Sequence, residues 1–298
     1  MSNCVISTRR PWRAWRNPYQ KEAVNTLKKR LYYGLILLFS ALFLFAAVML
    51  ILYFTESGKQ EKVYTELSQI HESAREDAPP IPVDEEGVSH PEDVWVTVND
   101  PNGNPLSILP EFVQLYSMNP HIAGWITIPG TKLDYPVMQT PGQTDYYLKR
   151  NFNRENSNHG CIYAREVCDV LKPSDNITIY GHRMKDGSMF APLSGYEDKD
   201  FWEEHPIIEF STLQNRYRYE VFAVFITTAS QGQGFRYHTF VDAAGQTDYD
   251  EFVSNCKELS LYDTGITPEY GDKLITLSTC EYTHINGRLV VVARRMDN

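Results

Sequence analysis

The most hydrophobic part of the chain is an uncharged run of 24 residues from Leu31 to Phe54. As a helix with a rise of about 1.5 Å per residue, this run reaches roughly 36 Å, enough to cross the ~30 Å hydrocarbon core of a membrane. Tyr33 and Tyr53 lie near its ends, where aromatic side chains favour the membrane–water interface. The pattern therefore predicts a transmembrane helix over residues 31–54.

Basic residues surround the start of this run. The first 30 residues hold eight Lys or Arg and a single acid, Glu22. Because positive flanks stay in the cytoplasm, residues 1–30 are predicted to form a cytoplasmic tail and everything after Tyr53 to face outside. The alternative is a cleaved signal peptide, but its apolar run is usually only ~7–15 residues long and ends at a small-residue cleavage site.

Residues 55–105 have the pattern of a helical stalk followed by a linker. Val63, Leu67, Ile70 and Ala74 recur at intervals of four, three and four, which predicts an amphipathic helix over 56–76. The proline-rich segment at 78–82 and the acidic stretch through residue 93 favour a solvated linker. A short helix is expected over 109–118, at the start of a domain that covers residues 106–298.

From Ile122 onward, short apolar runs alternate with turn signals such as Asn286-Gly287. Seven or eight short strands without an internal repeat predict a closed barrel or a sandwich. One helix is expected to interrupt the strands, over 249–259. The apolar runs cover residues 124–128, 160–164, 176–180, 207–210, 218–227, 274–278 and 289–293.

Composition narrows the classes of function. The chain is 42% hydrophobic and 13% aromatic, which supports a packed core, and its formal net charge of -10 argues against a nucleic-acid partner. Five cysteines without a CxxC pair argue against a zinc ribbon or a dense disulfide framework. No phosphate-binding glycine loop is visible, and the spacing of His159, Cys161 and Cys168 matches no common metal site. No cofactor is therefore expected.

Cys280 is the candidate nucleophile. It ends the apolar run that begins at Leu274, and a polar loop follows it. A cysteine at the end of a strand is held by a rigid element and reachable from solvent, as a nucleophile requires. The alternative is a buried structural thiol, which is the commoner state of a free cysteine.

Two basic residues can assist this thiol. His182 ends the apolar run that begins at Asn176, and imidazole is a natural acid–base partner for a thiol near neutral pH. His284 is the rival, although the intervening loop would have to fold back on itself. Arg288 opens the next strand; in a hairpin it would face Cys280, where a guanidinium can stabilise an oxyanion.

These candidates lie in motifs that resemble those of the sortase family. The segment TLSTC at 276–280 resembles the sortase nucleophile segment, and 179–182 and 287–290 resemble the segments that carry the sortase His and Arg. The likeness runs from about Leu109 to Arg295, whereas residues 78–105 have no match in the family. Segments 124–139, 145–148 and 189–193, and the helix near 249–259, resemble class B sortases in particular.

The resemblance implies an eight-stranded sortase barrel preceded by N-terminal helices. It also implies that Cys280 attacks the C-terminal sorting signal of a secreted protein, that His182 protonates the leaving amine, and that Arg288 supports the oxyanion. An amine of a peptidoglycan precursor then resolves the thioacyl enzyme. In this comparison Ser278 and Thr279 line the signal groove, and the backbone N–H of Glu281 completes the oxyanion hole.

Three other functions stay open at the level of sequence. A sortase that polymerises pilins would use a pilin lysine as the amine. A thiol hydrolase would use water in place of the amine. A surface-displayed β-domain without catalysis would leave Cys280 structural.

Overall fold

The computed structural model describes residues 18–84, 88–230, 233–281 and 286–296. The chain divides into two compact units, Met1–Thr55 and Glu56–Asn298. The first contains the N-terminal part of a long helix, α1 (Pro18–Asp77). In this part of α1, apolar residues such as Leu37 and Phe43 have more than two thirds of their surface exposed. The helix is long and apolar enough to cross a membrane. A helix that is apolar all round and unburied fits a lipid environment.

The sequence pattern predicted two helices, over 31–54 and 56–76, where the structure has one. No proline interrupts the junction, and the Thr55 hydroxyl donates to the carbonyls of Ile51 and Leu52, each at 2.9 Å. A polar residue whose side chain bonds to the preceding turn is compatible with an uninterrupted helix. The change from apolar to amphipathic composition therefore occurs within α1.

The second unit begins with the C-terminal part of α1, which packs along one face. Tyr64, Leu67 and His71 are buried, and Val63 and Ile70 are partly buried against the same core, close to the predicted apolar face. In the segment expected to be a linker, β1 (Val96–Asn99) pairs as an antiparallel hairpin with β2 (Pro105–Ile108), which begins where that segment ends. The sequence pattern did not predict these two strands.

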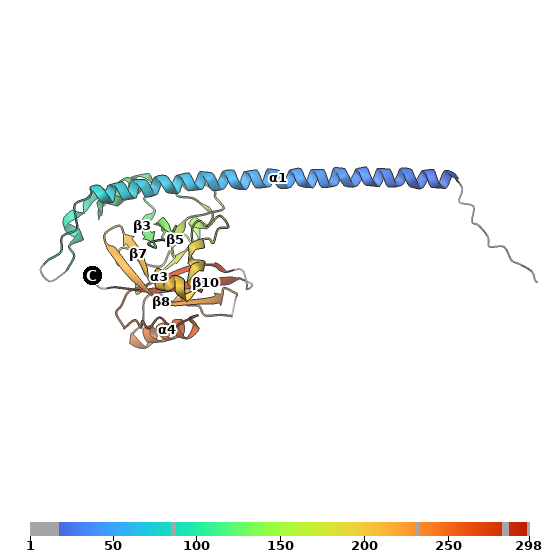
Figure 1. Ribbon diagram of the computed structural model, residues 1–298. Coiled ribbons are helices and arrows are strands. Elements are labelled where there is room, and N and C mark those ends of the chain that lie inside the picture. The colour runs from blue at the N-terminus through green and yellow to red at the C-terminus, as the bar shows by residue number, and fades with distance from the viewer. Residues whose placement is uncertain (1–17, 85–87, 231–232, 282–285, 297–298) are drawn as a thin grey trace, which may run out of the picture. The chain divides into compact units, whose positions relative to one another are not determined.

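Within the described residues, eight strands form a closed barrel in the order β10-β8-β7-β3-β4-β5-β6-β9, which confirms the predicted fold. Figure 1 shows these strands gathered in one domain with helix α4 beside β8. The pairs β4–β5 and β6–β9 are parallel and the other neighbours are antiparallel. The strands are β3 (Ile122–Thr127), β4 (Asp134–Met138), β5 (Ile162–Ala164), β6 (Asn176–Tyr180), β7 (Ile207–Thr212), β8 (Arg216–Thr228), β9 (Leu274–Glu281) and β10 (Gly287–Arg295).

Helices and turns connect these strands. The α-helices are α2 (Pro110–Met118), close to the prediction for 109–118, α3 (Lys199–Glu204), and α4 (Gln246–Leu259), which the sequence placed at 249–259. Short 3-10 helices are η1 (Pro91–Val94), η2 (Tyr146–Lys149), η3 (Ala191–Glu197) and η4 (Tyr237–Thr239).

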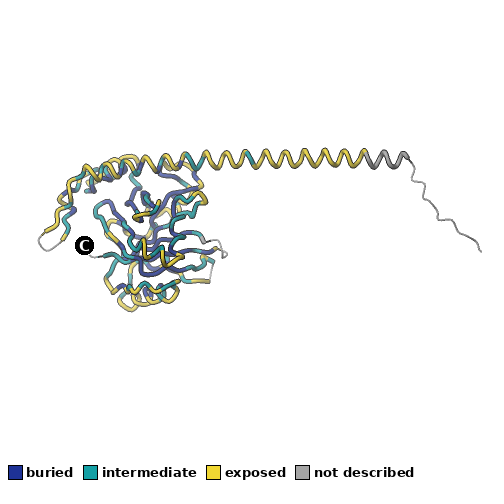
Figure 2. Tube along the Cα trace, in the orientation of Figure 1, coloured by how far each residue is buried: buried dark blue, intermediate teal, exposed yellow. Residues whose placement is uncertain are grey.

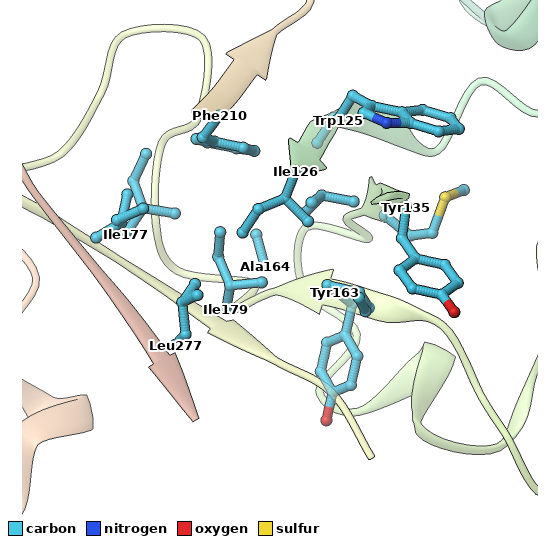
Figure 3. Close-up of a cluster of buried hydrophobic side chains, with 14 of the residues drawn as sticks. Trp125, Ile126, Tyr135, Tyr163, Ala164, Ile177, Ile179, Phe210 and Leu277 are labelled. Carbon is cyan, nitrogen blue, oxygen red and sulfur yellow. The ribbon is translucent and has the colours of Figure 1, made fainter. Parts of the chain in front are cut away.

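Alternation along the strands separates two hydrophobic clusters. Ile177 and Ile179 of β6 and Leu277 of β9 point into the main barrel core beside Ile126 and Phe210 (Figure 3). Residues of the opposite parity face outward, because successive side chains on a strand point to opposite faces. On that outer face α4 covers β8 and β10, with Phe252, Val253 and Cys256 buried against Val290 and Val292, among others. The strands are accordingly buried and one side of α4 is exposed (Figure 2).

His71 joins α1 to the barrel as a neutral side chain. Its ring stacks on Trp125 at a centroid distance of 4.2 Å, and only 5% of the residue is exposed. Burial lowers the pKa of His71 to about 4, because a charged imidazolium loses its hydration there. An unfolded chain binds this proton near pH 6.5, so the free energy of unfolding should fall as the pH falls from 6.5 toward 4.

We expect this residue to reduce stability by about 2–3 kcal/mol between pH 7 and pH 4.5. Substitution His71→Phe keeps a ring against Trp125 but removes the titrating group. Denaturant unfolding at both pH values should therefore show a smaller loss for His71→Phe than for the wild type. Equal losses in the two proteins would show that His71 does not titrate as its burial requires.

Candidate active site

Cys280 and Arg288 face each other on neighbouring strands. The antiparallel pairing of β9 and β10 places Arg288 directly opposite Cys280, and both residues are partly exposed. Each has the parity of the outward-facing residues on its strand, such as Ser278 and Val290. The hairpin expected from their spacing is thus present, and the two side chains lie on the outer side of the barrel.

His182 comes from the other neighbour of β9. The parallel pairing of β6 and β9 ends with Tyr180 opposite Ser278. His182 lies two residues beyond Tyr180, and Cys280 lies two residues beyond Ser278. The two chains stay joined past that point: the Gly181 N–H donates to the Ser278 carbonyl at 3.2 Å. Cys280 therefore occupies the middle strand, with His182 on one side and Arg288 on the other.

All three residues line one cleft of about 380 Å³. Ser278 and Thr279, the residues expected to line a substrate groove, also border it, although each is only 2% exposed. Glu281 is the last residue of β9 and pairs through its backbone with Gly287. The rest of the lining comes from β5, β6, η2, η4 and the neighbouring loops, namely Thr144, Asp145, Leu148, Tyr163, Arg165, Glu166, Tyr180, Gly181, Ala229, Tyr237 and His238.

Hydrogen bonds fix the floor of this cleft. The Thr279 hydroxyl donates to the Gly181 carbonyl at 2.8 Å, which fastens the end of β6 to β9. The Ser278 and Tyr237 hydroxyls lie 2.6 Å apart, and burial raises the pKa of Tyr237, so the phenol stays protonated. Tyr237 was missed by sequence reasoning because it belongs to an irregular segment between β8 and α4 that has no periodic pattern.

The Leu148 carbonyl orients the imidazole of His182. It lies 2.7 Å from Nε2 of that ring, and because a carbonyl oxygen only accepts, Nε2 carries the proton. Nδ1 is then the basic nitrogen of the neutral ring. A ring nitrogen held by one hydrogen bond leaves the other free for proton transfer, which is the usual arrangement around a catalytic histidine.

The other described cysteines are unsuited to nucleophilic chemistry. Cys161, Cys168 and Cys256 are buried, whereas Cys280 is partly exposed. Burial raises the pKa of Cys161 to about 12 and raises the pKa of Cys168 and Cys256 as well, so these thiols stay protonated. Cys4 and the rival histidine, His284, lie outside the described residues.

The metal site considered from His159, Cys161 and Cys168 does not assemble. His159 binds a carboxylate of Asp186, the Cys161 sulfur lies 3.3 Å from the Tyr64 hydroxyl, and the Cys168 thiol donates to a backbone carbonyl. Among the described residues, no group of three such side chains has the geometry to hold a metal ion.

Comparison with known proteins identifies the family. The model of the sortase domain matches residues 126–296. Sortase B of Listeria monocytogenes is 36% identical over 185 residues, which cover 61% of this chain and 72% of that protein.

Solved structures give the same result. Sortase B from B. anthracis superposes with a TM-score of 0.65 at 32% identity, covering 82% of this chain and all of that one. A substrate complex of Staphylococcus aureus sortase B gives a TM-score of 0.66 at 28% identity, over 82% of this chain and 99% of that chain. On this evidence the chain belongs to the sortase family of cysteine transpeptidases and is of the class B type.

Proposed function

We propose that this protein cleaves the C-terminal sorting signal of secreted proteins and joins them to an amine of a peptidoglycan precursor. The observation that carries the proposal is the strand pairing that sets Cys280 between His182 and Arg288 in one cleft. A nucleophile, an acid–base group and a cation in one cleft are the groups that acyl transfer needs. The relatives, which are sortases, support the same reaction class.

In the first half of the reaction the Cys280 thiolate attacks the carbonyl carbon of the scissile peptide bond. A C–S bond forms, and the carbonyl oxygen becomes an oxyanion that the Arg288 guanidinium and the backbone N–H of Glu281 stabilise. The C–N bond then breaks as protonated His182 gives its Nδ1 proton to the leaving amine. A thioester between Cys280 and the secreted protein remains.

In the second half an acceptor amine attacks this thioester. His182, now neutral, accepts a proton at Nδ1 as the new amide forms, and the Cys280 thiolate leaves. Ser278 and Thr279 act as walls of the signal groove, and the bond between Ser278 and Tyr237 keeps the groove in shape. The same chemistry with a pilin lysine would polymerise pilins, and with water it would be hydrolysis.

An assay with and without an amine separates transfer from hydrolysis. The full-length protein in detergent is incubated with peptides that match the C-terminal segments of secreted proteins. The acceptor amine is triglycine or a lysine-containing pilin peptide, and one reaction contains no amine. We expect one peptide class to be cleaved and to appear as an amide with triglycine, because thioesters react faster with amines than with water. Release of the free acid at the same rate with every acceptor would identify a thiol hydrolase.

We further propose that residues 31–54 anchor the protein in the cell membrane with residues 1–30 in the cytoplasm. The exposed apolar helix and the eight basic residues before it support this orientation. Protease added to cells stripped of their wall should digest the barrel and spare a tag placed at the N-terminus. A protected barrel beside a digested tag would reverse the orientation.

A further inference from the structure

The chain directly after His182 folds into a short hairpin that returns at Phe190. The Phe190 N–H donates to the His182 carbonyl at 2.9 Å, and a β-bridge joins Arg183 to Met189. The Phe190 ring packs so closely on Gly181 that an added Cβ there would meet it at 2.7 Å. The candidate acid–base residue, His182, is therefore the first residue of this hairpin. A shift of the hairpin would move the imidazole of His182.

Asp186 lies at the tip of the hairpin and accepts four hydrogen bonds. Its Oδ1 accepts from the backbone N–H and the hydroxyl of Ser188, at 3.0 and 2.6 Å. Its Oδ2 accepts from Nε2 of His159 at 2.8 Å and from the hydroxyl of Ser57 at 2.6 Å. The bonds to Ser188 are local, whereas the other two tie the tip to α1 and to the segment before β5.

These bonds keep the carboxylate charged. Partial burial alone would raise the pKa of Asp186, but hydrogen bonds from Ser188, Ser57 and His159 outweigh it and hold this pKa well below its ordinary value. Because the ionised carboxylate only accepts, Nε2 of His159 carries a proton. A buried N–H donor and a charged acceptor form one of the stronger kinds of hydrogen bond in proteins.

The segment that supplies His159 also reaches the other side of His182. His159 is 2% exposed and is followed by Gly160, whose backbone has a φ of +60°. A Cβ at Gly160 would lie 2.6 Å from the Leu148 carbonyl oxygen, the same oxygen that accepts from His182. Residues 159–160 thus contact both the tip of the hairpin and the carbonyl that orients the imidazole.

The tip of the hairpin borders a cavity. Asp186, Gly187 and Ser188 border a cavity of about 400 Å³ whose opposite wall is α1, including Ser57 and Gln60. At its C-terminal side the hairpin is held by the buried Met189, whose N–H donates to the Tyr135 hydroxyl at 3.2 Å, whereas at the tip the hydrogen bonds of Asp186 supply the contacts across the cavity. Loss of those bonds would leave room for the hairpin to shift.

We propose that His159 and Asp186, assisted by Ser57, are positioning residues that hold the hairpin so that His182 stays aligned with Cys280. The inference rests on the proposed role of His182 as the proton donor and acceptor. Neither His159 nor Asp186 lines the cleft that contains Cys280. Their effect is confined to proton transfer, where a misplacement of about 1 Å can cost about 10²-fold in rate.

The test uses the full-length protein in detergent and the cognate peptide with triglycine. We expect Asp186→Ala and His159→Leu each to lower kcat about 10-fold with KM within about two-fold of wild type. His159→Gln places an amide N–H near the position of Nε2 and should restore most of kcat. The matched control is Asp100→Ala, since Asp100 also accepts local backbone hydrogen bonds, from Asn102 and Asn104, but lies in the β1–β2 turn.

The same substitutions in a His182→Ala background decide between positioning and general stabilisation. If the pair acts through His182, Asp186→Ala should cause no further loss of kcat there. A further 10-fold loss in that background, or a wild-type kcat in Asp186→Ala alone, would overturn the inference while leaving the proposed function intact. Wild-type activity in His182→Ala alone would instead overturn the proposed role of His182, and the inference with it.

Discussion

Substitution Cys280→Ala is expected to abolish cleavage and transfer of the sorting peptide. Without the thiol no thioester can form, and we expect the rate to fall by at least about 10⁴-fold, as removal of a nucleophile does in other covalent enzymes. The cleft and its hydrogen bonds are otherwise retained, because Cys280 is partly exposed and small. The measurement is amine-dependent turnover of the peptide. Mass spectrometry of the intact protein should detect the thioester in the wild type and not in Cys280→Ala.

The three buried cysteines are the matched controls. Cys161→Ala, Cys168→Ala and Cys256→Ala each remove a thiol whose pKa is raised by burial. These variants should keep most of the activity per folded molecule and lose only stability, by about 1 kcal/mol. Turnover in Cys280→Ala at the wild-type rate would contradict the mechanism, whatever the controls show.

Substitutions of His182 and Arg288 should lower the rate for different reasons. His182→Ala removes the group that moves the proton, which typically costs ~10²–10⁴-fold. Arg288→Ala removes a donor to the oxyanion, where a single donor commonly contributes ~10²–10³-fold. Arg288→Lys keeps the charge but loses the planar guanidinium, so we expect it to recover little.

The experiment is the rate of amine-dependent cleavage by variants whose folding has been confirmed by their unfolding transitions. His284→Ala tests the rival imidazole, and His205→Ala is a control, since His205 bonds to the Pro129 carbonyl and does not line the cleft. Loss of activity in His284→Ala with retention in His182→Ala would assign the imidazole role to His284. A near-normal Arg288→Ala would remove Arg288 from the mechanism despite its position opposite Cys280.

Much of the fold follows from local patterns in the sequence. The short apolar run over 176–180 predicts β6 (Asn176–Tyr180) to the residue, because short apolar runs bounded by turn signals favour strands. The pairing of Cys280 with Arg288 is equally local: only eight residues separate them, and two apolar runs joined by a short polar loop favour a hairpin. Length and composition alone predict the apolar span over residues 31–54.

The boundaries of helices were less predictable. The sequence indicates two helical segments around Thr55, and composition changes there, but composition does not break a helix. Conversely, β1 lies in the segment whose composition predicted a linker, and β2 begins at the end of that segment. Their pairing depends on a turn held by Asp100 and on packing against the domain, neither of which leaves a periodic signal.

By itself, the sequence determined the apolar span, most of the barrel strands and the candidate residues Cys280, His182 and Arg288. Only the tertiary structure decided that β6 lies parallel to β9, which brings together segments about 98 residues apart, as the bond between Gly181 and Thr279 shows. Parallel pairing needs a long crossover, and no local period specifies the partner strand or its register. The contact of the Leu148 carbonyl with His182 and the contact of His159 with Asp186 have the same origin, because groups from distant loops meet only after the barrel closes.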